Sequence, residues 1–187
     1  MRTAKNQDLQ AQIDAPSNSA FILQGNAAFS LGVIHAGYHA ATGYAGTPST
    51  EVIDKTLAHV KDRMKVGWSV NEAVAVSTAL GHTMAGYDAL VTMKIPGVFQ
   101  AADAITTSAF FRGKAGALVI FAATDYVPSS TQHVIDARYL FASSRLPVLE
   151  PRNHPTVHCR VMQWFRSVAC SWIWGLLSPI RLYWGCW

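Results

Sequence analysis

Ala89-Leu90-Val91-Thr92-Met93 and Ala117-Leu118-Val119-Ile120-Phe121-Ala122 are the stretches that decide the fold. Both have the length of a strand and neither alternates apolar with polar residues, which is typical of parallel strands covered on both faces. The shorter run Phe21-Ile22-Leu23-Gln24 has the same character. The sequence therefore predicts a buried parallel sheet.

Helical stretches are predicted around these strands, over residues 26–38, 49–61, 71–86, 98–111 and 132–143. The second of them opens with Thr47-Pro48-Ser49 and Glu51, a good N-terminal signature. Strands that alternate with helices imply right-handed crossovers and a three-layer α/β fold, with helices on both sides of the sheet. The predicted core includes Ile22, Leu90, Val91, Leu118, Val119 and Phe121.

The charges divide the chain into three parts. Residues 1–150 contain eleven Lys or Arg and eleven Asp or Glu, whereas residues 151–187 add four Arg and no acid, so the formal net charge of +4 belongs to the tail. A neutral body argues against nucleic acid as a partner. We expect a mobile polar arm over residues 1–20, an α/β domain over residues 21–151 and an atypical tail over residues 152–187.

The tail holds all three cysteines and five of the six tryptophans. The cysteines lack metal-ligand spacing, and residues 1–20 lack the apolar core of a signal peptide, so we expect a cytoplasmic protein. The uncharged residues 167–180 fall short of the ~20 residues that cross a bilayer, but they can dock on a membrane or protein surface. Arg, Trp, Cys and Ser share G-rich codons, so a shifted reading frame would also explain their abrupt onset. A truncated product with an out-of-frame tail is therefore one hypothesis.

Four loops are candidates for a ligand site: residues 43–50, 67–72, 94–97 and 124–132. All are rich in Gly, Pro, Ser and Thr, and ligands of parallel sheets bind beyond the carboxyl ends of the strands. The sequence has neither G-x-G-x-x-G nor G-x-x-x-x-G-K-[ST], so a dinucleotide or nucleoside triphosphate is not indicated. The histidines are scattered, and no metal site is expected.

Glu72 is the most informative residue in these loops. The segment Trp68-Ser69-Val70-Asn71-Glu72 places its carboxylate at the start of a predicted helix. An acid there is ordinarily solvated and is favoured by the helix dipole. Glu72, however, has apolar sequence on both sides, and a poorly hydrated carboxyl can share a proton with a bound heterocycle. Both interpretations stay open from the residues alone.

Several segments together match a known family. They are Gly43-Tyr44-Ala45-Gly46-Thr47-Pro48-Ser49-Thr50, Trp68-Ser69-Val70-Asn71-Glu72, Ala89-Leu90-Val91-Thr92-Met93-Lys94, and Ser129-Ser130-Thr131-Gln132 with Asp136 and Arg138. In order and spacing they closely resemble the N-terminal, pyrimidine-binding domain of the indolepyruvate ferredoxin oxidoreductase alpha subunit. That subunit is one of the thiamine diphosphate-dependent 2-oxoacid:ferredoxin oxidoreductases. The resemblance covers about residues 21–151.

The resemblance implies oxidative decarboxylation of a 2-oxoacid of the arylpyruvate type. It implies that Glu72 bonds N1′ of the aminopyrimidine of thiamine diphosphate and so promotes loss of the thiazolium C2 proton. It places Thr47 near the carboxylate and reacting carbon of the substrate, and Gly97 and Lys94 in a loop that approaches the pyrimidine. Ser130 and Gln132 would form a further wall of the substrate site.

Departures from the family pattern limit what this chain can do alone. Ala45 replaces a proline of the family turn, and the acidic Gly-Asp-Gly type motif of the diphosphate and Mg²⁺ site is absent. No cysteine run for an iron–sulfur cluster is present either, so we expect Mg²⁺ and clusters on partner domains. The expected partner is a diphosphate-binding domain or subunit, in a dimer or hetero-oligomer, and the chain alone is expected to be inactive. The alternatives are a non-catalytic remnant of the fold, or an α/β binding module that docks through its tail.

Overall fold

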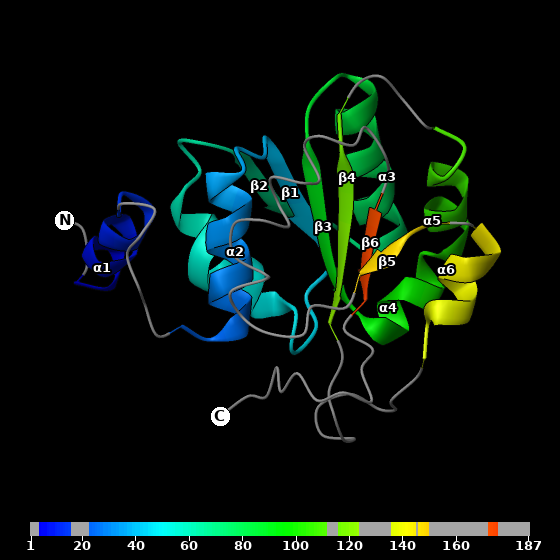
Figure 1. Cartoon of the computed structure of the whole chain (residues 1–187), viewed down its shortest axis with the longest axis horizontal. Coiled ribbons are helices and arrows are strands. Elements are labelled where there is room, and N and C mark those ends of the chain that lie inside the picture. The colour runs from blue at the N-terminus through cyan, green and yellow to red at the C-terminus, as the bar shows by residue number, and fades with distance from the viewer. Residues whose placement is uncertain are drawn as a thin grey trace.

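The computed structural model describes residues 4–15, 23–111, 116–123, 136–144, 146–149 and 172–175. Its strands form a six-stranded sheet in the order β2-β1-β3-β4-β6-β5, and every neighbouring pair is parallel (Figure 1). The strands are β1 (Ala40–Gly43), β2 (Lys65–Trp68), β3 (Ala89–Lys94), β4 (Leu118–Ala123), β5 (Val148–Leu149) and β6 (Trp172–Gly175). The predicted parallel α/β fold is therefore confirmed.

Helices cover both faces of the sheet, which gives three layers (Figure 1). One face carries α2 (Gly25–His35), the π-helical turn η1 (Val52–Thr56) and the 3₁₀ turn η2 (Leu57–His59). The other carries α3 (Glu72–Met84), α4 (Ile95–Gln100), α5 (Ala102–Ser108) and α6 (Arg138–Ser144). Because η1 follows β1 while α3 and α4 follow β2 and β3, the chain leaves neighbouring strands toward opposite faces.

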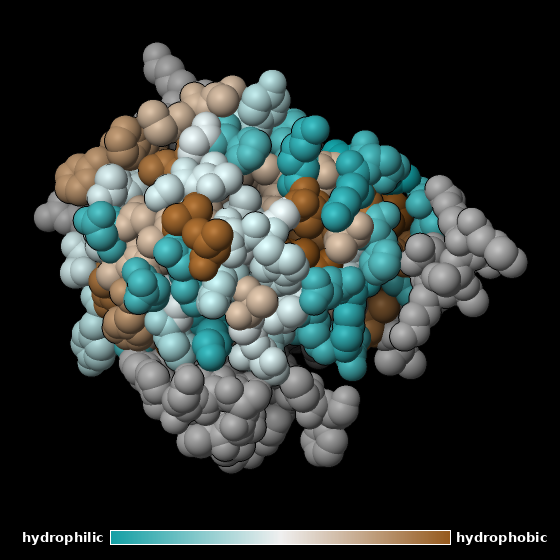
Figure 2. All heavy atoms as spheres, turned by 180° about the vertical axis from the view of Figure 1, so that it is seen from behind, coloured by the Kyte–Doolittle hydropathy of each residue, from teal (hydrophilic) through white to brown (hydrophobic). Residues whose placement is uncertain are grey.

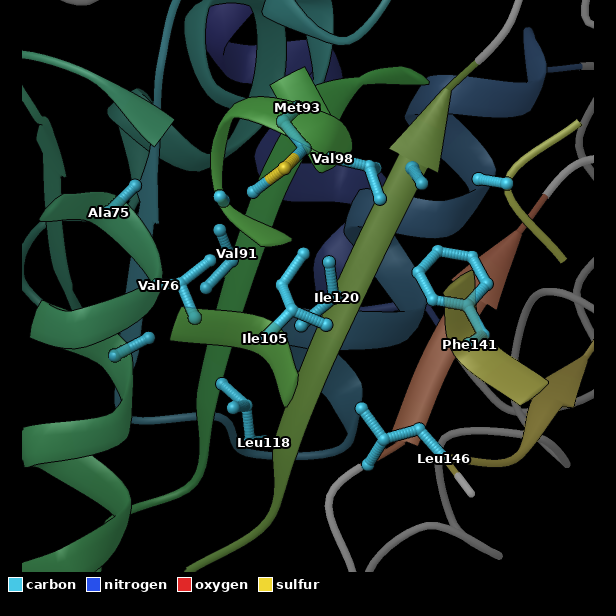
Figure 3. Packing of buried hydrophobic residues seen from close by; sticks show 14 of the residues in the cluster. Ala75, Val76, Val91, Met93, Val98, Ile105, Leu118, Ile120, Phe141 and Leu146 are labelled. Carbon is cyan, nitrogen blue, oxygen red and sulfur yellow. The ribbon is translucent and has the colours of Figure 1, made fainter. Parts of the chain in front are cut away.

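The core consists of two apolar layers, one on each face of the sheet. Leu90, Val119 and Phe121 point toward α2, where the rings of Phe121 and Phe29 stack with centroids 4.2 Å apart. Alternate residues of the same strands face α3, α5 and α6, as Figure 3 shows for Val91, Leu118 and Ile120. Burial of Leu90, Val91, Leu118, Val119 and Phe121 confirms that part of the predicted core, while Ile22 lies outside the described residues.

Sequence patterns misplaced several elements. No strand forms at Leu23 and Gln24, and residues 21 and 22 lie outside the described part. The patterns missed β1, because Ala-Ala-Thr-Gly has low strand propensity and is held by pairing on both sides, and also the edge strand β2. The predicted helix over residues 49–61 contains the π and 3₁₀ turns. The one over 98–111 begins earlier, at Ile95, with a proline in its first turn, and breaks at Ala101.

The two end regions contribute elements of their own. Residues of the expected arm form α1 (Ala4–Ile13), whose last residue, Ile13, is buried and hydrogen bonds through its carbonyl to Nε2 of His35 at 3.0 Å. In the expected tail, β6 pairs with β4 on one side and with β5 on the other. The backbone of residues 172–175 is thus part of the sheet.

Candidate functional site

The carboxyl edge of the sheet brings together three of the four predicted loops. Gly43, at the end of β1, is level with Trp68 of β2 and with Thr92 of β3. The loops that follow these strands therefore start side by side. The chain diverges to opposite faces at this edge, which is where parallel α/β sheets bind ligands.

Glu72 lies at this edge as the first residue of α3, and only 7% of its surface is exposed. It does not cap the helix, because the side chain of Asn71 accepts a hydrogen bond from the backbone N–H of Val74 at 2.8 Å. Within the described part of the chain, no hydrogen bond or ion pair to the Glu72 carboxylate is found. Glu72 is thus a largely buried residue whose carboxylate bonds to nothing in the described fold and is free to meet a ligand, which favours the functional interpretation of Glu72.

Gly97 lies against the side chain of Glu72. A Cβ atom at Gly97 would lie 2.4 Å from Oε1 and 2.8 Å from Cδ of Glu72, so no larger residue fits unless the carboxylate moves. Gly97 is buried in the first turn of α4, directly after β3. The sequence resemblance placed Glu72 and Gly97 at one site, and the structure puts them in contact.

The turn after β1 is held by its own hydrogen bonds. The carbonyl of Gly46 accepts bonds from the backbone N–H and the hydroxyl of Ser49, at 2.9 and 2.7 Å. The Gly46 N–H donates to Oγ1 of Thr50 at 2.8 Å, and Asn26 Nδ2 donates to the carbonyl of Pro48 at 3.0 Å. The Thr47–Pro48 peptide bond is cis, and Thr47 itself is exposed. Thr47 is thus an exposed residue in a turn whose conformation is held by hydrogen bonds.

Lys94 crosses from β3 to this turn. A Cβ atom at Gly46 would lie 3.0, 3.2 and 3.4 Å from Cδ, Cγ and Cε of Lys94, so the aliphatic part of the lysine covers Gly46. Lys94 is half-buried, and the structure shows no acidic partner for its ammonium group among the described residues. Lys94 and Glu72 are not an ion pair.

Two supporting residues were not singled out from the sequence. The buried hydroxyl of Thr42 in β1 donates to the carbonyl of Ala75 in the first turn of α3 at 2.9 Å, which ties that turn to the sheet. Asn71 is the cap, and an Asn directly before a predicted helix is a signal that could have identified it. Nothing in the sequence pattern points to Thr42, because its partner is a backbone carbonyl 33 positions away.

The structure does not test the whole predicted site. Ser130 and Gln132 lie outside the described residues. No group of three metal-ligating side chains occurs in the part of the chain that is described. Over the same residues, no helix has the length and apolar character needed to cross a membrane. Seen from behind, exposed apolar atoms form separate patches among polar ones (Figure 2).

Comparisons with known proteins find relatives of this chain. The chain is 37% identical over 145 residues to the indolepyruvate oxidoreductase subunit IorA of Archaeoglobus fulgidus, an alignment that covers 75% of this chain and 23% of that protein. It is 36% identical over 142 residues to IorA of Pyrococcus abyssi, and 32% identical over 148 residues to IorA of Methanothermobacter thermautotrophicus. These alignments cover 75% and 78% of this chain and 22% and 24% of the relatives. No protein-family model matches the chain.

A solved structure shares the fold. It is a 2-oxoglutarate:ferredoxin oxidoreductase from Magnetococcus marinus with 2-oxoglutarate, coenzyme A and succinyl-CoA bound, with a TM-score of 0.68 and 20% identity. The match covers 82% of this chain and 28% of that one. The chain spans less than a quarter of the length of the curated relatives cited here. By sequence, therefore, this chain is a relative of the IorA subunits of indolepyruvate oxidoreductases and corresponds to one part of them.

Proposed function

We propose that this chain is the pyrimidine-binding part of a thiamine diphosphate-dependent 2-oxoacid:ferredoxin oxidoreductase that acts on arylpyruvates. The observation that carries the proposal is Glu72, a residue that is 7% exposed and whose carboxylate lies against Gly97 without a partner in the described structure. A carboxylate kept in this state is suited to a proton shared with a ring nitrogen.

The residues of the carboxyl edge fit such a cofactor. Thiamine diphosphate supplies an electron sink for decarboxylation when it is bound. Glu72 would hold the aminopyrimidine through a proton at N1′. Because Gly97 has no side chain, the carboxylate has room to stay in this position. Thr47 would face the substrate from the turn that is held by its own hydrogen bonds, and Lys94 would lie against Gly46 of the same turn. Ser130 and Gln132 remain proposed substrate contacts on the strength of the sequence resemblance.

The remaining components would come from other domains or subunits. The relatives are more than four times as long as the matching region, which agrees with a partner that carries the diphosphate, Mg²⁺ and iron–sulfur sites. We propose a dimer or hetero-oligomer in the cytoplasm that is inactive without this partner. The competing proposals are a non-catalytic remnant, an out-of-frame tail and a docking module. The experiment below distinguishes a working part of an enzyme from a remnant and from a docking module.

The test is to co-express the full chain with the part of Archaeoglobus fulgidus IorA that lies outside the matching region, together with that enzyme's other subunits. The purified assembly is assayed for bound thiamine diphosphate and for C2 proton exchange of the cofactor. Glu72→Gln should lower the exchange rate about 10²- to 10⁴-fold, because glutamine cannot give up the proton, while assembly stays intact. A merely structural acid would cost about 1 kcal/mol of stability and leave exchange unchanged.

Asp103→Asn is the matched control. Asp103 is also an acid in the first turn of a helix, α5, but it is exposed. This variant should exchange the C2 proton at the parental rate. An assembly that contains no thiamine diphosphate would contradict the proposed function and favour a remnant or a docking module, and exchange unaffected by Glu72→Gln would contradict the role of Glu72.

A further inference from the structure

Lys94 is the one cation that the described structure places inside the loops of the carboxyl edge. Its Cγ, Cδ and Cε atoms lie along Gly46, within 3.0 to 3.4 Å of where a Cβ atom would stand. The ammonium nitrogen is one bond beyond Cε, so it stays close to Gly46. A lysine so placed loses the rotamer freedom of its stem, which opposes folding.

No ion pair in the described structure compensates for this cost. The basic side chains Lys55, Arg63 and Arg138 form ion pairs with Glu51, Asp14 and Asp136. Lys94 forms none, and the buried Glu72 carboxylate nearby in the fold is not within ion-pair distance. Gly46 supplies the space for the lysine stem, because the nearest atoms to any added side chain there all belong to Lys94. The turn thus has room for a lysine stem, and the charge of that lysine has no partner among the described residues.

We infer that Lys94 is a specificity residue that binds the carboxylate of the 2-oxoacid substrate, next to the turn that carries Gly46 and Thr47. The inference rests on the proposed function for the identity of the substrate. An ammonium group is a point charge that suits a carboxylate or a phosphate. A substrate carboxylate is favoured over the diphosphate of the cofactor, because the Lys94 stem covers Gly46, the residue before the exposed Thr47, and the chain offers no Gly-Asp-Gly type motif for a diphosphate.

The test uses the full chain without any cofactor. Backbone amide signals of Thr47 and Gly46 are followed by NMR at constant ionic strength while phenylpyruvate, phenylacetone or inorganic pyrophosphate is added. Phenylacetone has the same ring and ketone but no carboxylate. Phenylpyruvate should shift these signals saturably, and phenylacetone should not.

Variants then identify the residue responsible. Lys94→Met should weaken phenylpyruvate binding about tenfold, as expected for one charge-assisted hydrogen bond, and Lys94→Gln should do the same. Gly46→Ala keeps the charge but displaces the lysine stem, so it should weaken binding by a smaller factor. Lys65→Met removes an exposed lysine at the opposite end of β2 and should change nothing.

Three results would overturn the inference: unchanged phenylpyruvate binding in both Lys94 variants, an equal response to phenylacetone, or tighter binding of pyrophosphate that depends on Lys94. The last would assign the lysine to a phosphate. Because no thiamine is present, these results are independent of the Glu72 experiment. Thiamine binding that persists without a carboxylate response would overturn only the role of Lys94, and the reverse would contradict only the proposed cofactor.

Discussion

The charged and polar side chains at the two edges of the sheet differ in whether they have bonding partners. At the amino edge, Asp88 Oδ1 accepts a hydrogen bond from the backbone N–H of Ala117 at 2.8 Å, and His39 Nδ1 accepts one from the N–H of Asp88 at 3.2 Å. At the carboxyl edge, Glu72 and Lys94 have no such partner among the described residues. The side chains of the amino edge are bonded to the backbone, whereas the two charges of the carboxyl edge have no partner in the described structure, as the proposed ligand site requires.

Close-packed glycines at the two edges show the same contrast. A Cβ atom at Gly116, just before β4, would lie 2.3 Å from the carbonyl oxygen and 2.5 Å from the carbonyl carbon of Tyr87. The three nearest atoms to a Cβ atom at Gly97 all belong to the side chain of Glu72, the first of them at 2.4 Å. Backbone cannot give way cheaply, but a side chain can rotate. The same substitution should therefore damage the fold at Gly116 and the site at Gly97.

The largest expected effect is that of Gly116→Ala. The added methyl group must displace the backbone of Tyr87. It should also weaken the hydrogen bond from the Gly116 N–H to the Thr83 carbonyl, which is 2.9 Å long. We expect a loss of about 3 kcal/mol in the free energy of unfolding, measured by urea denaturation. Gly81→Ala is the control, because a Cβ atom there meets nothing within 4 Å and alanine favours the helix by up to about 1 kcal/mol. Equal stability of the two variants would show that the amino edge is not rigid.

A smaller effect on stability, of about 1 kcal/mol, is expected for Gly97→Ala, because the Glu72 side chain can turn away from the new methyl group. The effect on the site should be larger: in the co-expressed assembly, bound thiamine diphosphate should fall about tenfold or more, because the carboxylate is displaced. Thiochrome fluorescence of the released cofactor measures this loss. If stability fell by as much as in Gly116→Ala while cofactor content was retained, the two edges would not differ in the way described.

Sequence patterns predicted the centre of this molecule better than its margins. The apolar runs of β3 and β4 were recognised because burial on both faces leaves a continuous apolar stretch. By contrast, β1 is Ala-Ala-Thr-Gly, which no propensity marks as a strand, and its place depends on pairing with β2 and β3. The π and 3₁₀ turns after the cis peptide bond also have no signal in the periodicity.

The candidate site was predictable where one residue type carried the signal. Glu72 was apparent as an acid between apolar segments, and Gly97 followed from the family resemblance. The contact between them could not be predicted, because it depends on how α4 packs against α3. The contact of the Lys94 side chain with Gly46 could not be predicted either, because residues 94 and 46 are far apart in the sequence and no local pattern indicates such a contact.

The smallest effect, and a useful contrast to Glu72, is expected at Asp136, a carboxylate that precedes α6 and does have partners. It accepts hydrogen bonds from the backbone N–H of Arg138 at 2.9 Å and from Nε of the guanidinium at 2.9 and 3.0 Å, and the side-chain bond lowers the pKa of Asp136 below its ordinary value. A lowered pKa in the folded state means that this stabilisation is complete above the unfolded pKa and is lost as the pH falls through the folded one. The side chains of Arg138 and Asp136 are 47% and 35% exposed, so solvent screening limits the contribution of the pair to below about 1 kcal/mol.

Asp136→Asn should therefore lower the free energy of unfolding slightly at pH 7, and the difference from the parent chain should shrink as the pH falls below about 4. Urea midpoints at pH 7 and pH 3 measure this change, with the exposed Asp103→Asn as control. A deficit of the same size at both pH values would mean that Asp136 stabilises α6 through its shape and not through its charge.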